Sequence, residues 1–184
     1  MRGYFGIGVE GVSKPMNVGS LFRTAHAFGA SFVFTVNAQY AQDEGERADT
    51  SRAAQSVPLH EFASVGAIRL PRDCTLVGIE IAEDAELLPS FRHPRCAAYV
   101  LGPERGSLSP ELAAACAQLV KIPTRFAINL AIAGAIVMYD RLISLERFAA
   151  RPLGEGRVAE VLEPQEFGAP VLRRRRGQQK GGKG

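Results

Sequence analysis

Asn17, Gly19 and Arg23 are the first residues whose types and spacing could serve a reaction. An amide can orient a ligand, a glycine lets the backbone approach one, and a guanidinium pairs with phosphate or carboxylate groups. The same residues also have an ordinary structural interpretation. Asn17 is a good N-cap, Gly19 suits a first helical turn, and Arg23 would be a solvated side chain of that helix. Taken alone, the motif favours the structural interpretation.

Gly102, Glu104 and Gly106 belong to a second segment, LGPERG, which follows an apolar stretch. Glycines after a strand allow the backbone to approach a ligand closely, although they also allow a simple tight turn. The spacing fits neither the dinucleotide-binding pattern G-x-G-x-x-G nor a phosphate loop that ends in Gly-Lys-Ser/Thr.

Ile122, Pro123 and Asn129 mark a third segment, IPTRFAIN, which enters a helix rich in small residues. The ordinary interpretation is a proline-containing turn, an N-cap asparagine and a buried core helix. Each of the three segments is therefore a weak signal alone, and their significance depends on where the fold places them.

Apolar periodicity predicts a regular alternation of strands and helices. The expected strands are 4–9, 32–36, 57–59, 75–81, 97–101 and 119–122, and the expected helices are 17–28, 61–67, one beginning at 110, and 129–145. Residues 38–56 are predicted to be a loop or an exposed helix. Apolar strands alternating with helices indicate an α/β fold whose parallel sheet is covered on both faces. Ligands bind such sheets at the carboxyl ends of the strands, where all three segments lie.

The chain has 184 residues and a net charge of +3, and the positive charge is concentrated at one end. Residues 173–184 carry six basic and no acidic side chains, and the rest of the chain has a net charge of −3. A basic segment of this kind either contacts a polyanion such as RNA or DNA, or only solubilises the chain. We expect one domain over 1–149 and a flexible basic extension over 150–184.

Composition excludes several other classes of protein. The longest apolar stretch, around 126–139, is shorter than the roughly 18 to 20 residues that span a bilayer. No signal peptide is recognisable, so we expect a cytoplasmic protein. The three cysteines are far apart and do not pair with the histidines at zinc spacing. We therefore expect reduced cysteines packed as small hydrophobic side chains, with no structural metal.

The three segments together resemble the motifs of the SPOUT superfamily of RNA methyltransferases, in its SpoU–TrmH branch. The first family motif, N-x-G-x-x-x-R, matches Asn17 to Arg23. The second matches Gly102 and Glu104, with the next glycine one position early, and the third matches Ile122 to Asn129. Two features depart from the family pattern: Ala127 stands where a serine is usual, and the third segment is about three residues short.

The resemblance implies a deep trefoil knot in the C-terminal part of the sheet and S-adenosylmethionine as the cofactor. It further implies a homodimer with its sites near the subunit interface. The positions expected to bind the cofactor are Ile79, Glu80, Gly102, Ile122, Ala127 and Leu130. The form without an N-terminal RNA-binding domain is similar to tRNA-modifying members, which favours tRNA over rRNA as the substrate.

The resemblance also implies the reaction, which is methylation of a ribose 2′-oxygen of RNA. Arg23 would be the base that removes the hydroxyl proton, or would bind the neighbouring phosphate. Asn17 and Asn129 would orient Arg23 or the ribose, and Glu104 would hold its loop or pair with the arginine. Methylation of an RNA base remains an alternative, as does an RNA-binding module that has kept the fold and lost the chemistry.

Overall fold

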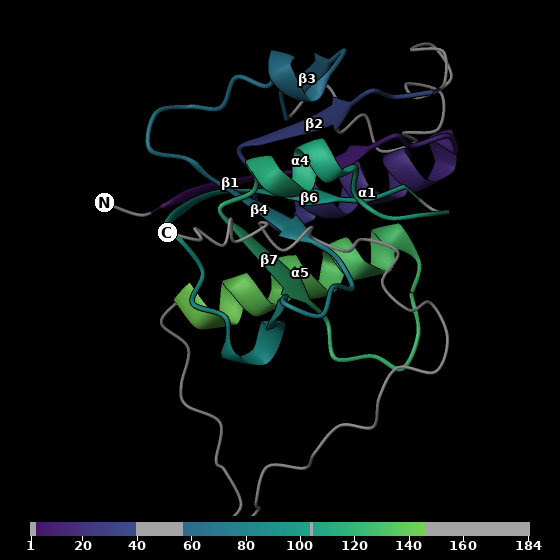
Figure 1. Ribbon diagram of the computed structural model, residues 1–184. Coiled ribbons are helices and arrows are strands. Elements are labelled where there is room, and N and C mark those ends of the chain that lie inside the picture. The colour runs from purple at the N-terminus through teal and green to yellow at the C-terminus, as the bar shows by residue number, and fades with distance from the viewer. Residues whose placement is uncertain (1–2, 40–56, 104, 146–184) are drawn as a thin grey trace, which may run out of the picture.

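The computed structural model describes residues 3–39, 57–103 and 105–145 of the chain. In this part, seven strands form one parallel sheet in the order β3-β2-β1-β6-β4-β7-β5 (Figure 1). The strands are β1 (Tyr4–Glu10), β2 (Phe32–Val36), β3 (Leu59–Phe62), β4 (Thr75–Ile79), β5 (Glu86–Leu87), β6 (Cys96–Leu101) and β7 (Gln118–Lys121). The predicted α/β fold with a parallel sheet is confirmed.

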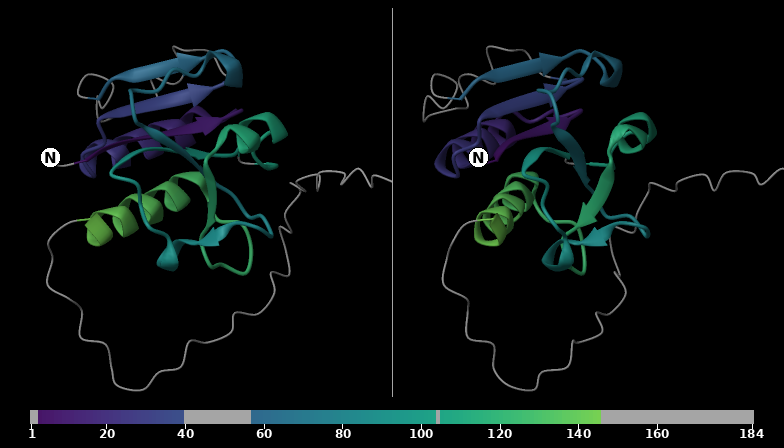
Figure 2. Two further views of the ribbon diagram at one scale, coloured as in Figure 1. Left: turned by 60° about the vertical axis from the view of Figure 1, so that its left-hand side comes forward. Right: turned by 90° about the vertical axis from the view of Figure 1, so that its left-hand side faces the viewer.

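Helices cover both faces of this sheet, as predicted. Helices α1 (Pro15–Ala27) and α5 (Leu130–Leu145) lie on one face, and the short α4 (Pro110–Ala115) lies on the other (Figure 2). Two 3-10 turns, Val65–Ala67 and Leu88–Ser90, complete the regular structure. Each face has its own apolar core, with the buried residues of α1 and α5 in one and those of α4 in the other.

Two glycines allow close packing at the centre of the fold. Gly6 of β1 faces Phe32 of β2, and a Cβ at that glycine would lie 2.2 Å from the phenyl ring. Gly134 of α5 meets Leu21 of α1 in the same way, with only 2.3 Å between a Cβ and the nearest leucine carbon. Because Leu21 is completely buried, α5 lies against α1 at a distance that only a glycine permits.

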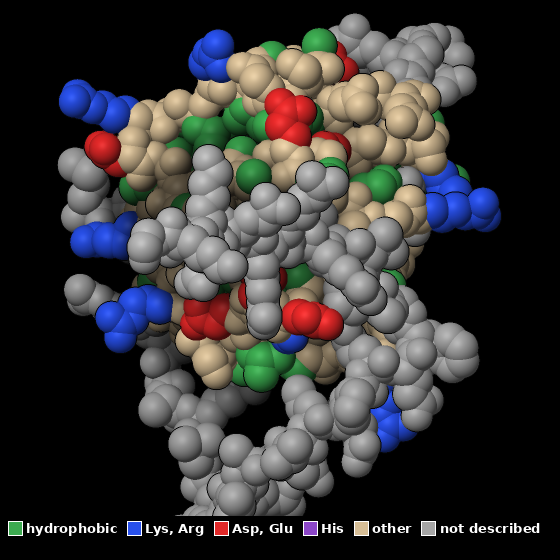
Figure 3. All heavy atoms as spheres, viewed as in Figure 1, with side chains coloured by type: hydrophobic (Ala, Val, Ile, Leu, Met, Phe, Trp, Pro, Cys, Tyr) green, Lys and Arg blue, Asp and Glu red, His purple; other side chains and the backbone are tan. Residues whose placement is uncertain are grey.

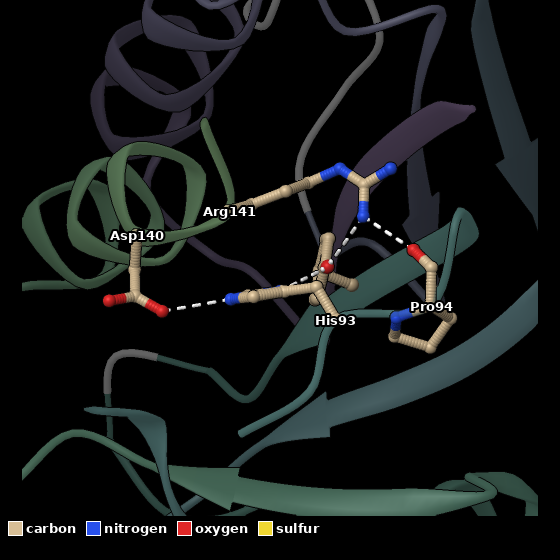
Figure 4. Close-up of polar contacts among 5 residues, drawn as sticks. His93, Pro94, Asp140 and Arg141 are labelled. Carbon is tan, nitrogen blue, oxygen red and sulfur yellow. Dashed lines mark hydrogen bonds and ion pairs between the residues drawn. The ribbon is translucent and has the colours of Figure 1, made fainter. Parts of the chain in front are cut away.

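A buried polar cluster attaches α5 to the amino ends of β1 and β6 (Figure 4). Arg141 donates hydrogen bonds to the carbonyl oxygens of Pro94 (2.6 Å) and Arg95 (2.7 Å), and to the Tyr99 hydroxyl (3.2 Å). The His93 ring contacts the Tyr99 hydroxyl at 2.6 Å and the Asp140 carboxylate at 2.9 Å. Burying an arginine is costly unless its donors are paired, and here carbonyl oxygens provide most of that pairing.

Several boundaries differ from the sequence prediction. Asn17 is not the N-cap of α1: the helix begins two residues earlier at Pro15, a residue suited to a first turn because it lacks an N–H. The strand expected at 57–59 lies at Leu59–Phe62, and this strand takes up the start of the helix expected at 61–67. Strand β5 was not predicted, because a strand of two residues in a polar segment is too short to show an apolar periodicity. The helix beginning at 110 is confirmed and is capped by Ser109.

Other predictions lie partly or wholly outside the described residues. The segments 40–56 and 146–184, including the basic extension, are not described, and the knot remains a prediction. The three cysteines are free thiols, of which Cys116 is buried and the other two are half-buried. Among the helices that the structure describes, none has the length and apolar content needed to cross a membrane.

Candidate functional site

A cavity of about 390 Å³ opens at the carboxyl ends of β4, β6 and β7. Its walls are the residues that follow these strands, together with the first turns of α1 and α5. All six positions expected to bind a cofactor line it: Ile79, Glu80, Gly102, Ile122, Ala127 and Leu130. The fold therefore brings together residues that are as far as 51 positions apart in the chain.

The lining of the cavity combines apolar and polar side chains. Ile79, Leu101 and Leu130 are buried and supply aliphatic surface. The polar lining residues are Lys14, Asn17, Glu80, Lys121, Thr124 and Asn129. Sites for small molecules commonly have this composition, in which apolar surface holds a ring and a few polar groups fix its orientation.

Glu80 has a more specific task than the sequence indicated. Its Oε1 accepts a hydrogen bond from the backbone N–H of Ile81 and its Oε2 accepts one from that of Leu108, each at 2.7 Å. Partial burial raises the pKa of Glu80, and the two hydrogen bonds lower it by less. Glu80 thus fixes the loop 102–109 that follows β6, while it also lines the cavity.

Glu10 holds the same loop from the other side, and the sequence analysis did not single it out. It is the last residue of β1, only 6% exposed, and its Oε2 accepts a hydrogen bond from the N–H of Ser109 at 2.7 Å. A carboxylate at the end of an apolar strand is unusual, because a buried charge needs a partner. A glutamate at the end of an apolar strand was therefore the sequence signal that would have identified Glu10.

Gly102 allows the loop to fold back over the strand end. A Cβ at this position would lie 3.0 Å from the backbone nitrogen of Leu108, the residue that Glu80 binds. The loop backbone and the cavity are therefore close together at this glycine, which agrees with the expected role of the second motif.

Asn17 and Asn129 connect the first turns of α1 and α5 at the edge of the cavity. The Nδ2 of Asn129 donates to the Oδ1 of Asn17 at 3.2 Å. The Oδ1 of Asn129 in turn accepts from the N–H of Ala131 at 2.9 Å, which caps α5. Two residues predicted for catalysis thus lie together, and the ordinary interpretation of Asn129 as an N-cap is also correct.

Of the other two predicted catalytic residues, the structure describes only Arg23. Arg23 is exposed and does not line the cavity. It follows Asn17 by six positions, about one and two-thirds helical turns, so the two side chains leave α1 in different directions. Glu104 lies outside the described residues. Ala127, where the resemblance led us to expect a serine, presents only a methyl group to the cavity.

Lys14, Lys121 and Thr124 also line the cavity without having been predicted. Lys121 ends β7 and donates to the carbonyl oxygen of Ala82 at 3.0 Å. Lys14 stands at the N-cap position of α1. Nothing distinguished these lysines in the sequence from ordinary surface residues. Among the described residues, no three histidine, cysteine or acidic side chains gather as a metal ion would require.

Comparison with known proteins gives this site a context. The model of the SpoU rRNA Methylase family matches residues 5–139. The mouse protein "tRNA (guanosine(18)-2'-O)-methyltransferase TARBP1" is 26% identical over 137 residues, a match that covers 70% of this chain and 9% of the mouse protein. The chain therefore corresponds to a small part of that relative.

Solved structures share the fold. The rRNA methyltransferase from Sinorhizobium meliloti with bound AdoMet has a TM-score of 0.69 at 23% identity, and the match covers 79% of this chain and 58% of that one. The SpoU methyltransferase AviRb from Streptomyces viridochromogenes in complex with AdoMet has a TM-score of 0.66 at 23% identity, and the match covers 78% of this chain and 61% of that one. A structure described as "Structural insights into the 2-OH methylation of C/U34 on tRNA" has a TM-score of 0.67 at 23% identity, and the match covers 78% of this chain and 91% of that one.

The family match extends from β1 into α5 and includes every strand of the sheet and every segment that lines the cavity. The resemblance seen in three short motifs thus holds for the greater part of the chain. On this evidence the chain belongs to the SpoU rRNA methylase family.

Proposed function

We propose that this protein is an S-adenosylmethionine-dependent RNA methyltransferase that acts on a ribose 2′-oxygen, with tRNA as the favoured substrate. The observation that carries the proposal is the cavity at the carboxyl edge of the sheet, where all six positions expected to bind the cofactor meet. Membership of the family supports methyl transfer to RNA, and the names of the mouse relative and of the tRNA structure favour the ribose and tRNA.

The chemistry of the cavity fits this cofactor. Its aliphatic wall, which includes Ile79 and Leu130, suits an adenine ring. Backbone groups beside Gly102 and Ile122 and the polar side chains at the edge suit the ribose and the amino acid portion. When bound, the cofactor supplies a methyl group from its sulfonium, which leaves a thioether, and the attacking hydroxyl loses its proton.

The roles proposed for this chain's residues follow from their positions. Asn17 and Asn129 lie at the edge of the cavity, where they would orient the ribose that receives the methyl group. Arg23 would accept the hydroxyl proton or bind the adjoining phosphate. Because Arg23 is exposed outside the cavity of its own chain, it can act only by approaching that cavity or by serving that of a second subunit.

A homodimer is part of the proposal. The side chains of Ile132, Tyr139 and Ile143 on α5 are 55%, 46% and 38% exposed, and Met16 on α1 is 76% exposed. Apolar surface of this kind on neighbouring helices is typical of an interface between subunits. A second subunit would also bring two sites near each other, as the resemblance implies.

Contact with RNA needs positive charge as well as a site. Figure 3 shows Lys and Arg side chains scattered over one face with acidic side chains among them, so those visible in that view do not form a single basic patch. The six basic residues of 173–184, which lie outside the described part, are the concentrated positive charge of the chain. We propose that this segment contributes to RNA binding.

The proposal is tested by titrating the protein with S-adenosylmethionine and by assaying transfer of a labelled methyl group to tRNA. A 2′-O-methylated nucleotide protects the following phosphodiester bond from alkali, which distinguishes the ribose from a base as the acceptor. Cofactor binding without transfer to any RNA would favour the RNA-binding module. Loss of both would contradict the proposal.

Arg23→Ala provides the first prediction. Turnover should fall by a factor on the order of 10² to 10⁴, as expected when a positioned proton acceptor is removed. Cofactor affinity and melting temperature should not change, since the side chain is exposed and outside the cavity. Arg23→Lys should restore little activity, because lysine lacks the planar fork of the arginine guanidinium.

The matched control is Arg92→Ala, which removes an exposed arginine near the amino end of β6. Equal turnover in both variants would remove Arg23 from the mechanism.

A further inference from the structure

A second cavity, of about 560 Å³, lies beside the first at the carboxyl ends of β1 and β2. Lys14 and Pro103 line both cavities, so the two are adjacent. The loop 102–109 is the wall between them, because Gly102 and Gly106 line the first cavity and Arg105 lines the second.

The lining of the second cavity differs in chemistry from that of the first. It consists of serine hydroxyls, the amides of Asn37 and Gln39, the cations of Lys14 and Arg105, and one carboxylate, that of Glu10. Pro103 is its one apolar side chain among the described residues. An amide both donates and accepts hydrogen bonds, so this surface suits a ligand with polar edges and a negative charge.

The walls of this cavity are fixed by hydrogen bonds. Gly11 N–H donates to the Val36 carbonyl at 2.8 Å, and Gln39 N–H donates to the Val12 carbonyl at 3.0 Å, which joins the turns after β1 and β2. Asn37 has a positive φ of 49°, a conformation that asparagine tolerates well. The dividing loop is held by the two carboxylates described above, at Leu108 and Ser109.

We propose that the second cavity takes one nucleotide of the RNA substrate. The amides of Asn37 and Gln39 contact the edge of its base, and Lys14 and Arg105 contact its phosphate. Its ribose then lies toward Lys14 and Pro103, where the cavity meets the proposed cofactor site. This inference rests on the proposed function and extends it, because neither Asn37 nor Gln39 belongs to the three motifs. Because the amides of Asn37 and Gln39 contact the edge of the base in this proposal, they would determine which base is accepted.

The test compares Gln39→Ala and Arg105→Ala with the controls Gln118→Ala and Arg72→Ala, an amide and an arginine that are exposed and outside both cavities. Asn37→Gly removes the third contact and still permits the positive φ. The KM for tRNA should rise about five- to tenfold in each cavity variant, the equivalent of one lost hydrogen bond. Cofactor affinity, measured by calorimetry, should not change in any of them.

A second measurement separates this inference from the proposed function. Binding of the four ribonucleoside 5′-monophosphates is measured by NMR titration in the wild type, Gln39→Ala and Gln118→Ala. If the wild type transfers no methyl group yet binds a monophosphate, and Gln39→Ala weakens that binding, the nucleotide site stands without the proposed reaction. If RNA is methylated and the cavity variants match their controls within twofold, the nucleotide site is wrong and the reaction stands. If the wild type neither methylates RNA nor binds a monophosphate, both are wrong.

Discussion

Glu80 and Glu10 hold the loop 102–109 by accepting hydrogen bonds from its backbone. The Glu80 carboxylate accepts the backbone N–H of Leu108 in this loop and that of its own neighbour Ile81, and the Glu10 carboxylate accepts the N–H of Ser109 in the loop. The loop contributes to both cavities, so its position affects both. We therefore infer that Glu80 and Glu10 act as positioning residues through this loop, and the cofactor contact expected of Glu80 stays a prediction beside this role.

Glu80→Gln should weaken cofactor binding about tenfold and change the melting temperature little. Glutamine has one accepting oxygen, so Ile81 or Leu108 loses its partner and the loop shifts. The raised pKa of Glu80 shows that its charge is costly to bury, and removing that charge offsets the lost hydrogen bond in stability. Calorimetry and thermal melting measure the two quantities. The control is Glu83→Gln, an exposed glutamate. Unchanged affinity in Glu80→Gln would mean that the loop position is irrelevant to the cofactor.

Helix α5 joins the proposed cofactor site to the opposite edge of the sheet. Its first turn is capped by Asn129 at the cavity, and Arg141 near its other end binds the carbonyl oxygens of Pro94 and Arg95. His93 and Asp140 add a further contact in the same cluster. This attachment fixes the helix along its length and so holds the residues at its start, including Leu130, in the cavity wall.

The His93 contact predicts a dependence of stability on pH. Burial lowers the pKa of His93, and Asp140 opposes this only in part. The unfolded chain therefore binds a proton near the usual histidine pKa of about 6.5 before the folded chain does. The free energy of unfolding should fall as the pH drops from about 7 to 5.

Urea denaturation across this range measures the free energy of unfolding against pH. Its profile should be flatter for His93→Gln than for the wild type, and it should be unchanged for His26→Gln, which replaces an exposed histidine. Parallel profiles for His93→Gln and the wild type would contradict the prediction.

Among the helices and strands, the sequence predicted those with a regular apolar period and missed features that depend on contacts with distant parts of the chain. Apolar periods identified β1, β2, β6 and α5 to within about two residues. Strand β5 has only two residues and pairs with β7, a strand more than 30 positions later. The start of α1 was misplaced: Asn17, a good N-cap by type, lies in the first turn of the helix and accepts a hydrogen bond from Asn129, the residue before α5.

The same limit applies to the candidate site. Glycine, proline and asparagine located its loops, because backbone geometry restricts those positions to few residue types. Lys14 and Gln39 could not be found in this way. Their roles arise from the side-by-side placement of β1 and β2 with the loop after β6, and no local pattern encodes that placement.

The described part of the molecule exposes several large apolar side chains along α5 and just before it. Ile132, Tyr139 and Ile143 lie along α5, and Phe126 precedes it with 57% of its surface exposed. We infer that a second copy of the chain covers this surface, since both copies would bury the same apolar patch around a two-fold axis.

Ile143→Glu should shift the protein from dimer to monomer, because the interface would then bury an unpaired charge. Ser144→Glu, which adds the same charge at the adjacent exposed position, should leave the dimer intact. Sedimentation equilibrium at micromolar concentration measures the outcome. A wild-type monomer, or equal dissociation of both variants, would exclude this surface as the interface.

The packing of α5 against α1 has a consequence for biosynthesis. Arg141 binds the carbonyl oxygen of Tyr4, 137 positions earlier in the chain, and the glycine of α5 meets Leu21. At about 5 to 20 residues per second, translation from α1 to the end of α5 takes on the order of ten seconds. Throughout that interval the apolar side of α1 has no covering helix. The nascent chain therefore leaves this apolar side without its helical partner until α5 has left the ribosome, and contacts so distant in sequence form slowly even then.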